Sequence, residues 1–529
     1  MWTRTSTPAT ESRGGAECGR RAPAPFICPN TASNVQSRRT TSISACRSRT
    51  SGPSGADFAI LRFVRAWKTS LIVAGAAALA AGGFALGRGS FGARALSSAA
   101  LPPPVRVAAA ALAATSVSTV ADAVQATPTA PTTLRVQLAG DVLPHRPSLV
   151  TATEISQALA PLTPLFARAD ATVVNYETAT GDPALVGDRR LTYAAKPDWM
   201  AALASSGIDA ITVANNHACD LGIPGVDATI ETARRTNVLA LGVTDDDPED
   251  SSDPWRARVI ASKDGHGVCA VAWTALMNDE ASSCARSGKI AEANASSVGR
   301  ARIARAIAAA KREPGCDAVV AIFHGGLEYQ AMGNEPRTQA RVAAEAGADL
   351  VVMHHPHVAS PLEMLATKDG RKVPLFASLG NLVTNQGESW RMPLFPSAPD
   401  PHLVCMNAWT RLGVIADVSF SWDAARRLEV AYGYHLVWTD NDHAEHPARA
   451  SSRIVARLVD PTTDAALIAR LDDDARGPVD LFTNEHWMDR AAIPPSGERT
   501  AAGARQPRLA AAPPRWRRPT STSAARMTR

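Results

Sequence analysis

Short apolar runs alternate with amphipathic stretches over the middle of the chain. Eight runs rich in Val, Ile, Leu and Ala have the length of buried strands and lie at 134–139, 171–175, 210–214, 238–243, 268–273, 318–323, 350–353 and 374–378. Helical patterns fall between them, at 154–160, 225–236, 298–312 and 338–346. Two later segments, 413–421 and 428–438, alternate in character and predict antiparallel strands. The β-α-β-α order predicts an α/β layered domain over about 134–493.

The two ends of the chain lack any such pattern. Residues 1–56 are rich in Ser, Thr, Arg, Pro and Gly, and residues 494–529 are rich in Pro, Arg and Ala. These compositions cannot bury enough apolar surface to offset the entropy lost on ordering. Both ends are therefore predicted to be disordered basic tails. The first is either a cytoplasmic tail or translated sequence upstream of the true start.

A membrane segment is predicted at 60–90, with its core at 71–87. Residues 71–86 carry no charge, and Arg62, Arg65 and Lys68 precede them. A basic flank before an apolar run is typical of an export signal or an N-in anchor. The run is shorter than the roughly 20 residues of most spanning helices. Small residues at 95–100 offer a cleavage site, so a retained anchor is favoured and a cleaved signal stays open.

A linker rich in Ala, Pro and Thr is predicted at 91–133, where it would hold the body off the membrane. The body itself is acidic, because residues 131–493 contain 33 Lys and Arg against 45 Asp and Glu. The sequence pI of about 8.8 is thus due to the tails. Without a basic patch or an RNA-binding motif in the body, we expect no nucleic-acid partner.

Polar motifs follow the predicted strands at the points where the strands end. They are Gly140-Asp141, Asn175-Tyr176-Glu177, Asn215-Asn216-His217 with Asp220, His324, His354-His355-Pro356-His357 and Asn381. In open α/β sheets the carboxyl ends of the strands form the ligand crevice. We therefore expect these six motifs to converge.

The residue types in these motifs indicate divalent metal ions. Asp, Glu, Asn and three His offer hard oxygen and imidazole ligands, which suit Mn, Fe or Zn rather than Ca. Two such ions bridged by one carboxylate can activate water for attack on phosphorus. Each motif alone has a simpler interpretation, since Gly140-Asp141 fits a turn and a single His is usually satisfied in the core. The spacing of His355 and His357, which puts both rings on one face of an extended chain, favours ligands.

The cysteines give a weaker signal. The body contains five, at positions 219, 269, 284, 316 and 405, of which at most four can pair with one another. Cys219 lies inside the third motif without a second Cys nearby, which argues against a redox site. Cys269 and Cys316 lie in or beside predicted strands, where they either pair or pack, and packing is favoured.

The order of the motifs resembles the CapA family of capsule and poly-γ-glutamate synthesis proteins, which are related to calcineurin-like metallophosphoesterases. The matching stretches are LAGDVLPHR (138–146), VVNYET (173–178), GIDAITVANNHACDLGIPGVDATIETARRTNVLALGV (207–243), AIFHGGLEYQ (321–330), AGADLVVMHHPHV (346–358) and LFASLGNLV (375–383). The resemblance implies a four-layer α/β/β/α sandwich, with a CapA-like domain at 134–385 completed by 386–493. It also implies a body outside the cytoplasmic membrane.

The resemblance assigns roles by motif. It gives Asp141 and His357 to one metal, Glu177 to the bridging position, and Asn216, His324 and His355 to the second metal. It gives His217 the role of protonating a leaving oxygen or orienting phosphate, with Asp220 orienting His217. Further candidates are Asn175, Asn215, His354 and Asn381.

The motifs depart from the metallophosphoesterase pattern at two positions. Leu143 stands where those enzymes usually have His, and His145 need not replace it. Glu177 stands where Asp is usual, and the CapA family shares both departures. Because of them, the number of metal ions and the enzymatic activity stay open.

Three functions compete for this sequence. The first is a membrane-anchored accessory protein that handles a capsule or poly-γ-glutamate polymer or its synthesis and export machinery. The second is a metal-dependent phosphodiesterase or phosphatase of the cell envelope. The third is a non-catalytic binding module on the same fold. The body is expected outside the cytoplasm, either held by the N-terminal anchor or secreted after signal cleavage.

Overall fold

The computed structural model describes residues 131–187, 189, 191–244, 253–400, 403–478 and 480–488. The predicted tails, the membrane segment at 60–90 and nearly all of the linker lie outside this part of the chain. Within it, no helix combines the length and the apolar character needed to cross a membrane.

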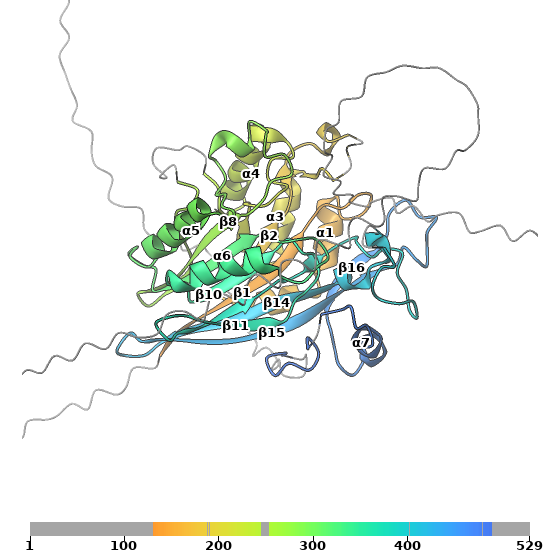
Figure 1. The fold of residues 1–529 in the computed structure, drawn as a ribbon. Helices are drawn as coiled ribbons and strands as arrows, with labels where there is room; N and C mark the ends of the chain where they lie inside the picture. The colour runs from red at the N-terminus through yellow and green to blue at the C-terminus, as the bar shows by residue number, and fades with distance from the viewer. Residues whose placement is uncertain are drawn as a thin grey trace, which may run out of the picture. The chain divides into compact units, whose positions relative to one another are not determined.

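Two sheets lie at the centre of the described fold (Figure 1). The first runs β16-β15-β14-β1-β2-β5-β6, with β13 beside β1, and the second runs β11-β12-β10-β9-β8-β7; β3 pairs only with β4. The strand bounds are β1 Thr132–Val142, β2 Ala171–Tyr176, β3 Ala179–Thr180, β4 Ala194–Ala195, β5 Ala210–Thr212, β6 Leu239–Leu241, β7 Arg258–Lys263, β8 His266–Thr274, β9 Ala318–His324, β10 Leu350–His354, β11 Leu362–Ala366, β12 Lys372–Phe376, β13 Asn381–Val383, β14 Leu412–Trp422, β15 Leu428–Asn441 and β16 Ile454–Leu458.

Helices cover the outer faces of both sheets. The helices are α1 Ala152–Leu159, α2 Thr163–Phe166, α3 Pro197–Ser205, α4 Gly222–Arg235, α5 Ser297–Ala310, α6 Asn334–Glu345 and α7 Ala465–Asp472. Residues of α1, α3 and α4 share a buried cluster with β1, β2 and β5 of the first sheet. Residues of α5 and α6 share another with β8, β9 and β10 of the second sheet. The predicted α/β class and its four layers are confirmed.

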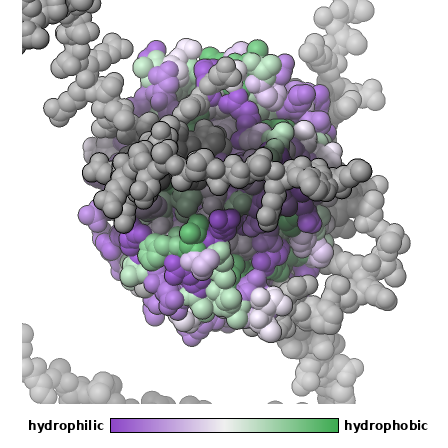
Figure 2. All heavy atoms as spheres, turned by 90° about the vertical axis from the view of Figure 1, so that its right-hand side faces the viewer, coloured by the Kyte–Doolittle hydropathy of each residue, from purple (hydrophilic) through white to green (hydrophobic). Residues whose placement is uncertain are grey.

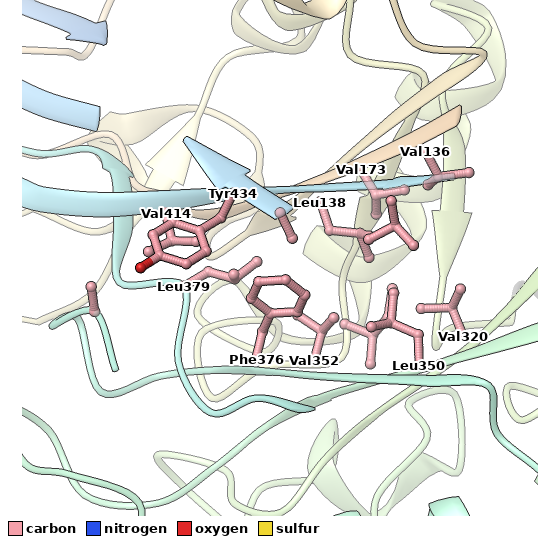
Figure 3. Packing of buried hydrophobic residues seen from close by; sticks show 14 of the residues in the cluster. Val136, Leu138, Val173, Val320, Leu350, Val352, Phe376, Leu379, Val414 and Tyr434 are labelled. Atoms are coloured by element: carbon pink, nitrogen blue, oxygen red, sulfur yellow. The ribbon is translucent and has the colours of Figure 1, made fainter. Parts of the chain in front are cut away.

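The main core lies between the two sheets (Figure 3). Alternate residues of each strand point into it, because successive side chains of a strand face opposite sides. Val136, Leu138 and Val173 enter from the first sheet, and Val320, Leu350, Val352 and Phe376 enter from the second. Burial of these side chains holds the sheets face to face, at about 25 cal/mol per Å² of apolar surface removed from water.

The late strands complete the first sheet. β14 pairs antiparallel with β1 along eight residues and with β15 on its other side, which confirms the antiparallel arrangement expected from their alternation. On the face shown in Figure 2, hydrophilic residues cover much of the described surface and smaller hydrophobic groups lie between them.

A buried charge cluster ties β1 to β14 and β15. Asp417 of β14 accepts hydrogen bonds from Arg135 Nε at 2.6 Å and Gln137 Nε2 at 3.0 Å, and His435 Nε2 lies 3.3 Å from it. Burial alone would raise the pKa of Asp417, but the hydrogen bonds from His435 and Arg135 outweigh burial and hold that pKa well below its usual value. The cluster is therefore ionised in the folded state at neutral pH.

Replacing Asp417 with alanine should lower the free energy of unfolding by about 3 kcal/mol, because it leaves Arg135 and Gln137 without their acceptor. A carboxyl whose folded pKa is lowered stabilises the fold above its unfolded pKa, near 4, and loses that contribution as the pH falls below it. The free energy of unfolding, measured with urea at pH 7 and pH 3, should thus fall less between the two pH values in Asp417→Asn than in wild type. Glu231→Ala, which removes an exposed ion pair with Arg235, is the matched control and should change little. Equal effects of the two alanine variants would contradict this account.

Candidate metal centre

A bulge at Gly140 turns Asp141 toward the space between the sheets. Ala139 pairs with Val174 but Asp141 pairs with Asn175, so β1 has one extra residue at this point. In a regular strand without the bulge, Asp141 would lie on the same face as Ala139 and would point toward the outer helices. The position requires glycine, because a Cβ on Gly140 would lie 2.1 Å from the carbonyl oxygen of Gly380.

The predicted motifs do converge at the carboxyl ends of the strands. β1, β2, β5, β9 and β10 all end at this site, and β13 begins there. Eleven of the twelve predicted side chains are buried: Asp141, Asn175, Glu177, Asn215, Asn216, His217, His324, His354, His355, His357 and Asn381. Asp220 is half-buried.

One group of ligand atoms gathers around His324 at the end of β9. Its Nε2 lies 2.8 Å from Asn216 Oδ1, 3.1 Å from His355 Nδ1 and 3.5 Å from Glu177 Oε1. The other ring nitrogen of His324 lies 3.2 Å from Asn175 Nδ2, which orients the ring. Glu177, His324 and His355 thus form a candidate metal-binding group.

A second group shares Glu177 with the first. Asp141, Glu177 and His357 offer ligand atoms that all lie within 4.8 Å of one another. His357 Nδ1 is 3.1 Å from Asp141 Oδ2, and its Nε2 is 3.7 Å from Glu177 Oε1. Glu177 therefore lies where a carboxylate would bridge two ions.

Two buried carboxylate oxygens fit metal ions better than they fit the surrounding protein. Glu177 Oε1 is buried and accepts no hydrogen bond from any residue that the structure describes, and Asp141 Oδ2 is buried beside the His357 ring, itself a candidate ligand, at 3.1 Å. A buried charged oxygen without a partner is costly unless a cation completes its surroundings. The donor set of carboxylate, amide and imidazole groups suits Mn, Fe or Zn.

Burial and close charges perturb the titration of these groups in opposite directions. Burial raises the pKa of Glu177 well above its usual value. For Asp141, burial is outweighed by contacts with His354 and His357, and its pKa falls well below the usual value. Burial lowers the pKa of His324 well below its usual value and that of His355 to about 3, so both are neutral at pH 7. Neutral imidazole is the form that binds metal.

The backbone around the site is strained in three places. His355, His357 and Tyr329 have positive φ angles of 100°, 57° and 60°. Such conformations cost roughly 1–3 kcal/mol for residues other than glycine and persist where surrounding contacts enforce them. Here the amide of Tyr329 donates to the carbonyl oxygen of Pro356 at 2.7 Å, which joins the two strained segments.

His217 lies beside the ligand groups and is held by its own carboxylate. Its Nδ1 is 2.8 Å from Asp220 Oδ2, and its backbone amide donates to Asn215 Oδ1 at 3.1 Å. Asp220 also accepts from the backbone amide of Tyr193. With Nδ1 committed to Asp220, the other ring nitrogen of His217 is the one available to a ligand.

The four further candidates brace the ligands. Asn175 Nδ2 donates to Asp141 Oδ1 at 2.8 Å, and Asn215 Nδ2 donates to the carbonyl oxygen of Tyr176 at 2.9 Å. His354 Nδ1 lies 3.2 Å from Asp141 Oδ1. Asn381 Oδ1 lies 3.0 Å from His357 Nδ1, and its Nδ2 donates to the carbonyl oxygens of His357 and Thr410.

A cavity of about 220 Å³ opens onto His217, His355 and His357. Several of its lining residues were not predicted as site residues: His145, Tyr193, Asn278, Glu328, Tyr329, Asn385, Gln386 and Glu388. The position of His145 directly after β1 was a usable signal. Glu328 and Tyr329 lie in the matching stretch 321–330, although no role was assigned to them there. The others lie on loops without a motif, so the sequence offered no means of finding them.

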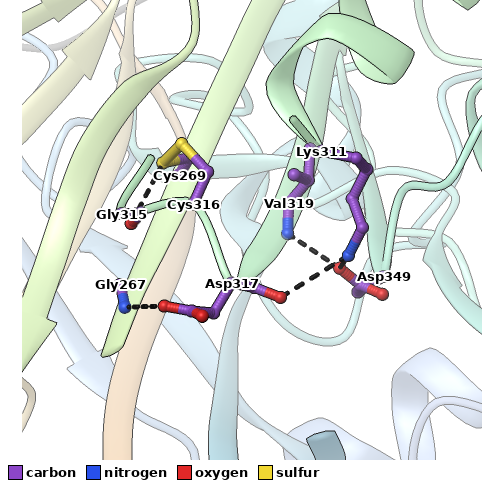
Figure 4. Close-up of a disulfide and its surroundings, with 8 residues drawn as sticks. All are labelled: Gly267, Cys269, Lys311, Gly315, Cys316, Asp317, Val319 and Asp349. Carbon is purple, nitrogen blue, oxygen red and sulfur yellow. Dashed lines mark hydrogen bonds and ion pairs between the residues drawn. A yellow bond between two sulfur atoms is a disulfide. The ribbon is translucent and has the colours of Figure 1, made fainter. Parts of the chain in front are cut away.

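Two disulfide bonds correct the expectation for the cysteines. Cys269 and Cys316, for which packing was favoured, are bonded to each other, and Cys219 is bonded to Cys284 across 65 residues of sequence. Sequence spacing could not pair Cys219 with so distant a partner. Figure 4 shows the first bond near Gly315, where Cys316 precedes β9. That is the end of β9 opposite His324.

The Cys219–Cys284 bond, in contrast, lies next to the site. Cys219 follows His217 in the third motif, and Cys284 belongs to the loop that carries Asn278. Asn278 Oδ1 accepts from Asn216 Nδ2 at 3.0 Å, which leaves Asn216 Oδ1 facing His324. The disulfide thus ties together two loops that meet at the second ligand group.

Residues 135–386 match the family model described as bacterial capsule synthesis protein PGA_cap. The chain is 30% identical over 178 residues to the PGA biosynthesis protein CapA of Bacillus subtilis (strain 168), covering 33% of this chain and 42% of the relative. It is 28% identical over 207 residues to the capsule biosynthesis protein CapA of Bacillus anthracis, covering 38% and 46%. The alignments thus span less than half the length of these curated relatives.

The matched region contains all six strand-end motifs and every residue of the two ligand groups. The resemblance inferred from those motifs is confirmed. Residues 135–386, just under half of the chain, thus match the bacterial capsule synthesis protein family PGA_cap.

Proposed function

We propose that this protein is a metal-dependent accessory protein of capsule polymer assembly, with its body outside the cytoplasm. The observation that carries the proposal is the pair of overlapping ligand groups joined at Glu177, inside the region that matches the family. Both relatives are named for capsule or PGA biosynthesis, which supports a polymer such as poly-γ-glutamate, or the machinery that makes or exports it, as the partner.

Asp141, Glu177 and His357 would hold one ion, and Glu177, Asn216, His324 and His355 the other. Divalent ions bound there would polarise a phosphoryl or carbonyl oxygen of a ligand. The side chains of the cavity wall would orient the ligand.

Two features support a location outside the cytoplasm. The described body contains the disulfides Cys219–Cys284 and Cys269–Cys316, and such bonds persist in oxidising compartments. The basic flank and apolar run at 60–90 supply an export signal or anchor. An anchored body would act close to the membrane where an exported polymer emerges.

Deletion of the gene in its own host should reduce the polymer at the cell surface, and the full-length chain should restore it. The chain with Asp141→Asn and Glu177→Gln should be exported but should not restore polymer. An immunoblot after protease treatment of intact protoplasts would report whether the body is accessible from outside. Unchanged surface polymer in the deletion strain would count against the proposed role, and a protected body would count against the location.

A second candidate function is hydrolysis of a phosphoester, which the His217–Asp220 pair beside the cavity favours. Water would add to phosphorus while the bond from phosphorus to the leaving oxygen breaks. A proton from His217 would complete the leaving alcohol, and the proton that the attacking water loses would return to His217 through solvent, so a phosphodiester would yield an alcohol and a phosphomonoester. Asp220 would keep the His217 ring oriented toward the leaving oxygen.

A further inference from the structure

His145 is a buried imidazole in the cavity wall that belongs to neither ligand group. Its side chain is 3% exposed and lines the cavity together with His217 and His357. Its ring packs edge-on against Tyr193, whose ring in turn packs against His217. His145 is thus held at a fixed place beside the predicted reacting centre.

The hydrogen bonding of His145 determines which of its ring nitrogens carries the proton. The backbone amide of Asn385 points at Nδ1 at 3.4 Å, so Nδ1 acts as the acceptor. Nε2 then carries the proton, because a neutral imidazole has one donor and one acceptor. This Nε2–H makes no hydrogen bond with any residue that the structure describes, although the side chain is almost wholly buried.

The protonation state of His145 is also defined by its surroundings. Burial, and then the proximity of His357 and His217, lower the pKa of His145 to about 3. The ring is therefore neutral over the physiological range. Asn385 is itself fixed, since it donates to Glu388 Oε2 at 2.6 Å and accepts from Asn441 Nδ2 at 2.9 Å.

The charges around the cavity restrict what His145 can bind. None of the described residues that line the cavity is Lys or Arg, whereas Glu328 and Glu388 both belong to the lining. Tyr193 and Tyr329 remain protonated because burial raises the pKa of each. Apart from metal ions and His357, whose contacts with Glu177 and Asp141 outweigh burial and raise its pKa to about 10, an anionic oxygen would therefore meet donors without a Lys or Arg charge, and a second negative charge would lie near carboxylates.

We infer that His145 is a substrate-binding residue whose Nε2–H donates to a phosphoryl oxygen, and that the cavity selects singly charged phosphodiesters over doubly charged phosphomonoesters. The inference rests on the proposed hydrolytic function. The neutral Nε2–H can donate a hydrogen bond to a phosphoryl oxygen, but it brings no positive charge to offset the second negative charge of a dianion. Glu328 and Glu388 add repulsion against the dianion and offer acceptors to hydroxyl groups on the rest of a substrate.

Two variants of the full-length protein test the role of His145. His145→Ala removes the donor, and His145→Gln replaces it with an amide N–H. Dimethyl phosphate binding, measured by calorimetry, should weaken about tenfold or more in His145→Ala and stay within about threefold of wild type in His145→Gln. Binding that is equal in wild type and His145→Ala, or equally weak in both variants, would overturn the inference.

Selectivity gives a second readout. Wild type should hydrolyse bis-p-nitrophenyl phosphate faster than p-nitrophenyl phosphate, and Glu328→Gln should raise the monoester rate relative to the diester rate severalfold. Faster hydrolysis of the monoester by wild type would overturn the inference.

The metal content of each preparation separates the two proposals. Wild type without metal would contradict the metal-dependent function, whereas wild type with metal but no effect of His145→Ala on binding would contradict only the inference.

Discussion

Replacing Glu177 with glutamine should abolish the stabilisation of this protein by divalent metal. Glu177 is the residue common to both ligand groups, and its Oε1 has no hydrogen-bond partner among the residues that the structure describes. Glutamine keeps the size of the side chain but removes the charge that two cations would share. Because an ion that binds only the folded state stabilises it by about 2.7 kcal/mol at a hundred times its Kd, wild type should melt several degrees higher with Mn²⁺ than with a chelator. The variant should melt at the same temperature in both.

Glu388→Gln is the matched control for that measurement. Glu388 is also a buried carboxylate in the cavity wall, but it belongs to neither ligand group. Differential scanning calorimetry of the three proteins should show metal stabilisation in wild type and Glu388→Gln alone. If Glu177→Gln retained the full metal-dependent shift, Glu177 would not be the bridging ligand and the arrangement of two joined sites would be wrong.

Loss of His217 should reduce hydrolysis of a phosphodiester by about 10²- to 10⁴-fold, the usual contribution of a general acid. The imidazole is held by Asp220 at 2.8 Å and lies at the cavity beside both ligand groups. It is absent from the candidate ligand groups themselves, so His217→Ala should bind the same amount of metal as wild type. Steady-state rates with an alkyl phosphodiester, whose alkoxide leaving group needs the proton, together with metal content, would measure both effects.

Asp220→Asn provides the intermediate case. It keeps His217 in place but removes the carboxylate that fixes the orientation of its ring, so the rate should fall less than in His217→Ala. With a leaving group less acidic than p-nitrophenol, the rate difference between wild type and each variant should be larger, because the departure of such an alcohol depends more on its protonation. A wild-type rate in His217→Ala would remove general acid catalysis by His217 from the mechanism.

The central strands were predictable from sequence because both of their faces are buried. β8, β9 and β10 lie inside the second sheet, and their continuous apolar runs follow from that position. The edge strands β7 and β11 were not predicted, since their exposed positions interrupt the apolar pattern. The helix α3 was also missed, although Pro197 at its first position was an available signal.

The ligands were accessible to sequence reasoning for a different reason. Each polar motif directly follows a buried strand, and parallel strands bring their carboxyl ends together whatever the loops do. The bulge at Gly140 could not be read from the sequence, yet it decides which way Asp141 points. Long-range contacts such as Cys219–Cys284 and the approach of Asn385 to His145 depend on tertiary structure and leave no local pattern.

Mass spectrometry of metals in the purified full-length protein tests the central claim most directly. The control is the His355→Ala/His357→Ala double variant, which removes one imidazole from each ligand group. The account predicts one to two equivalents of Mn, Fe or Zn per wild-type chain and a marked loss in the variant. Wild type that holds no metal after incubation with each ion, or a variant that holds as much as wild type, would contradict the metal centre described above.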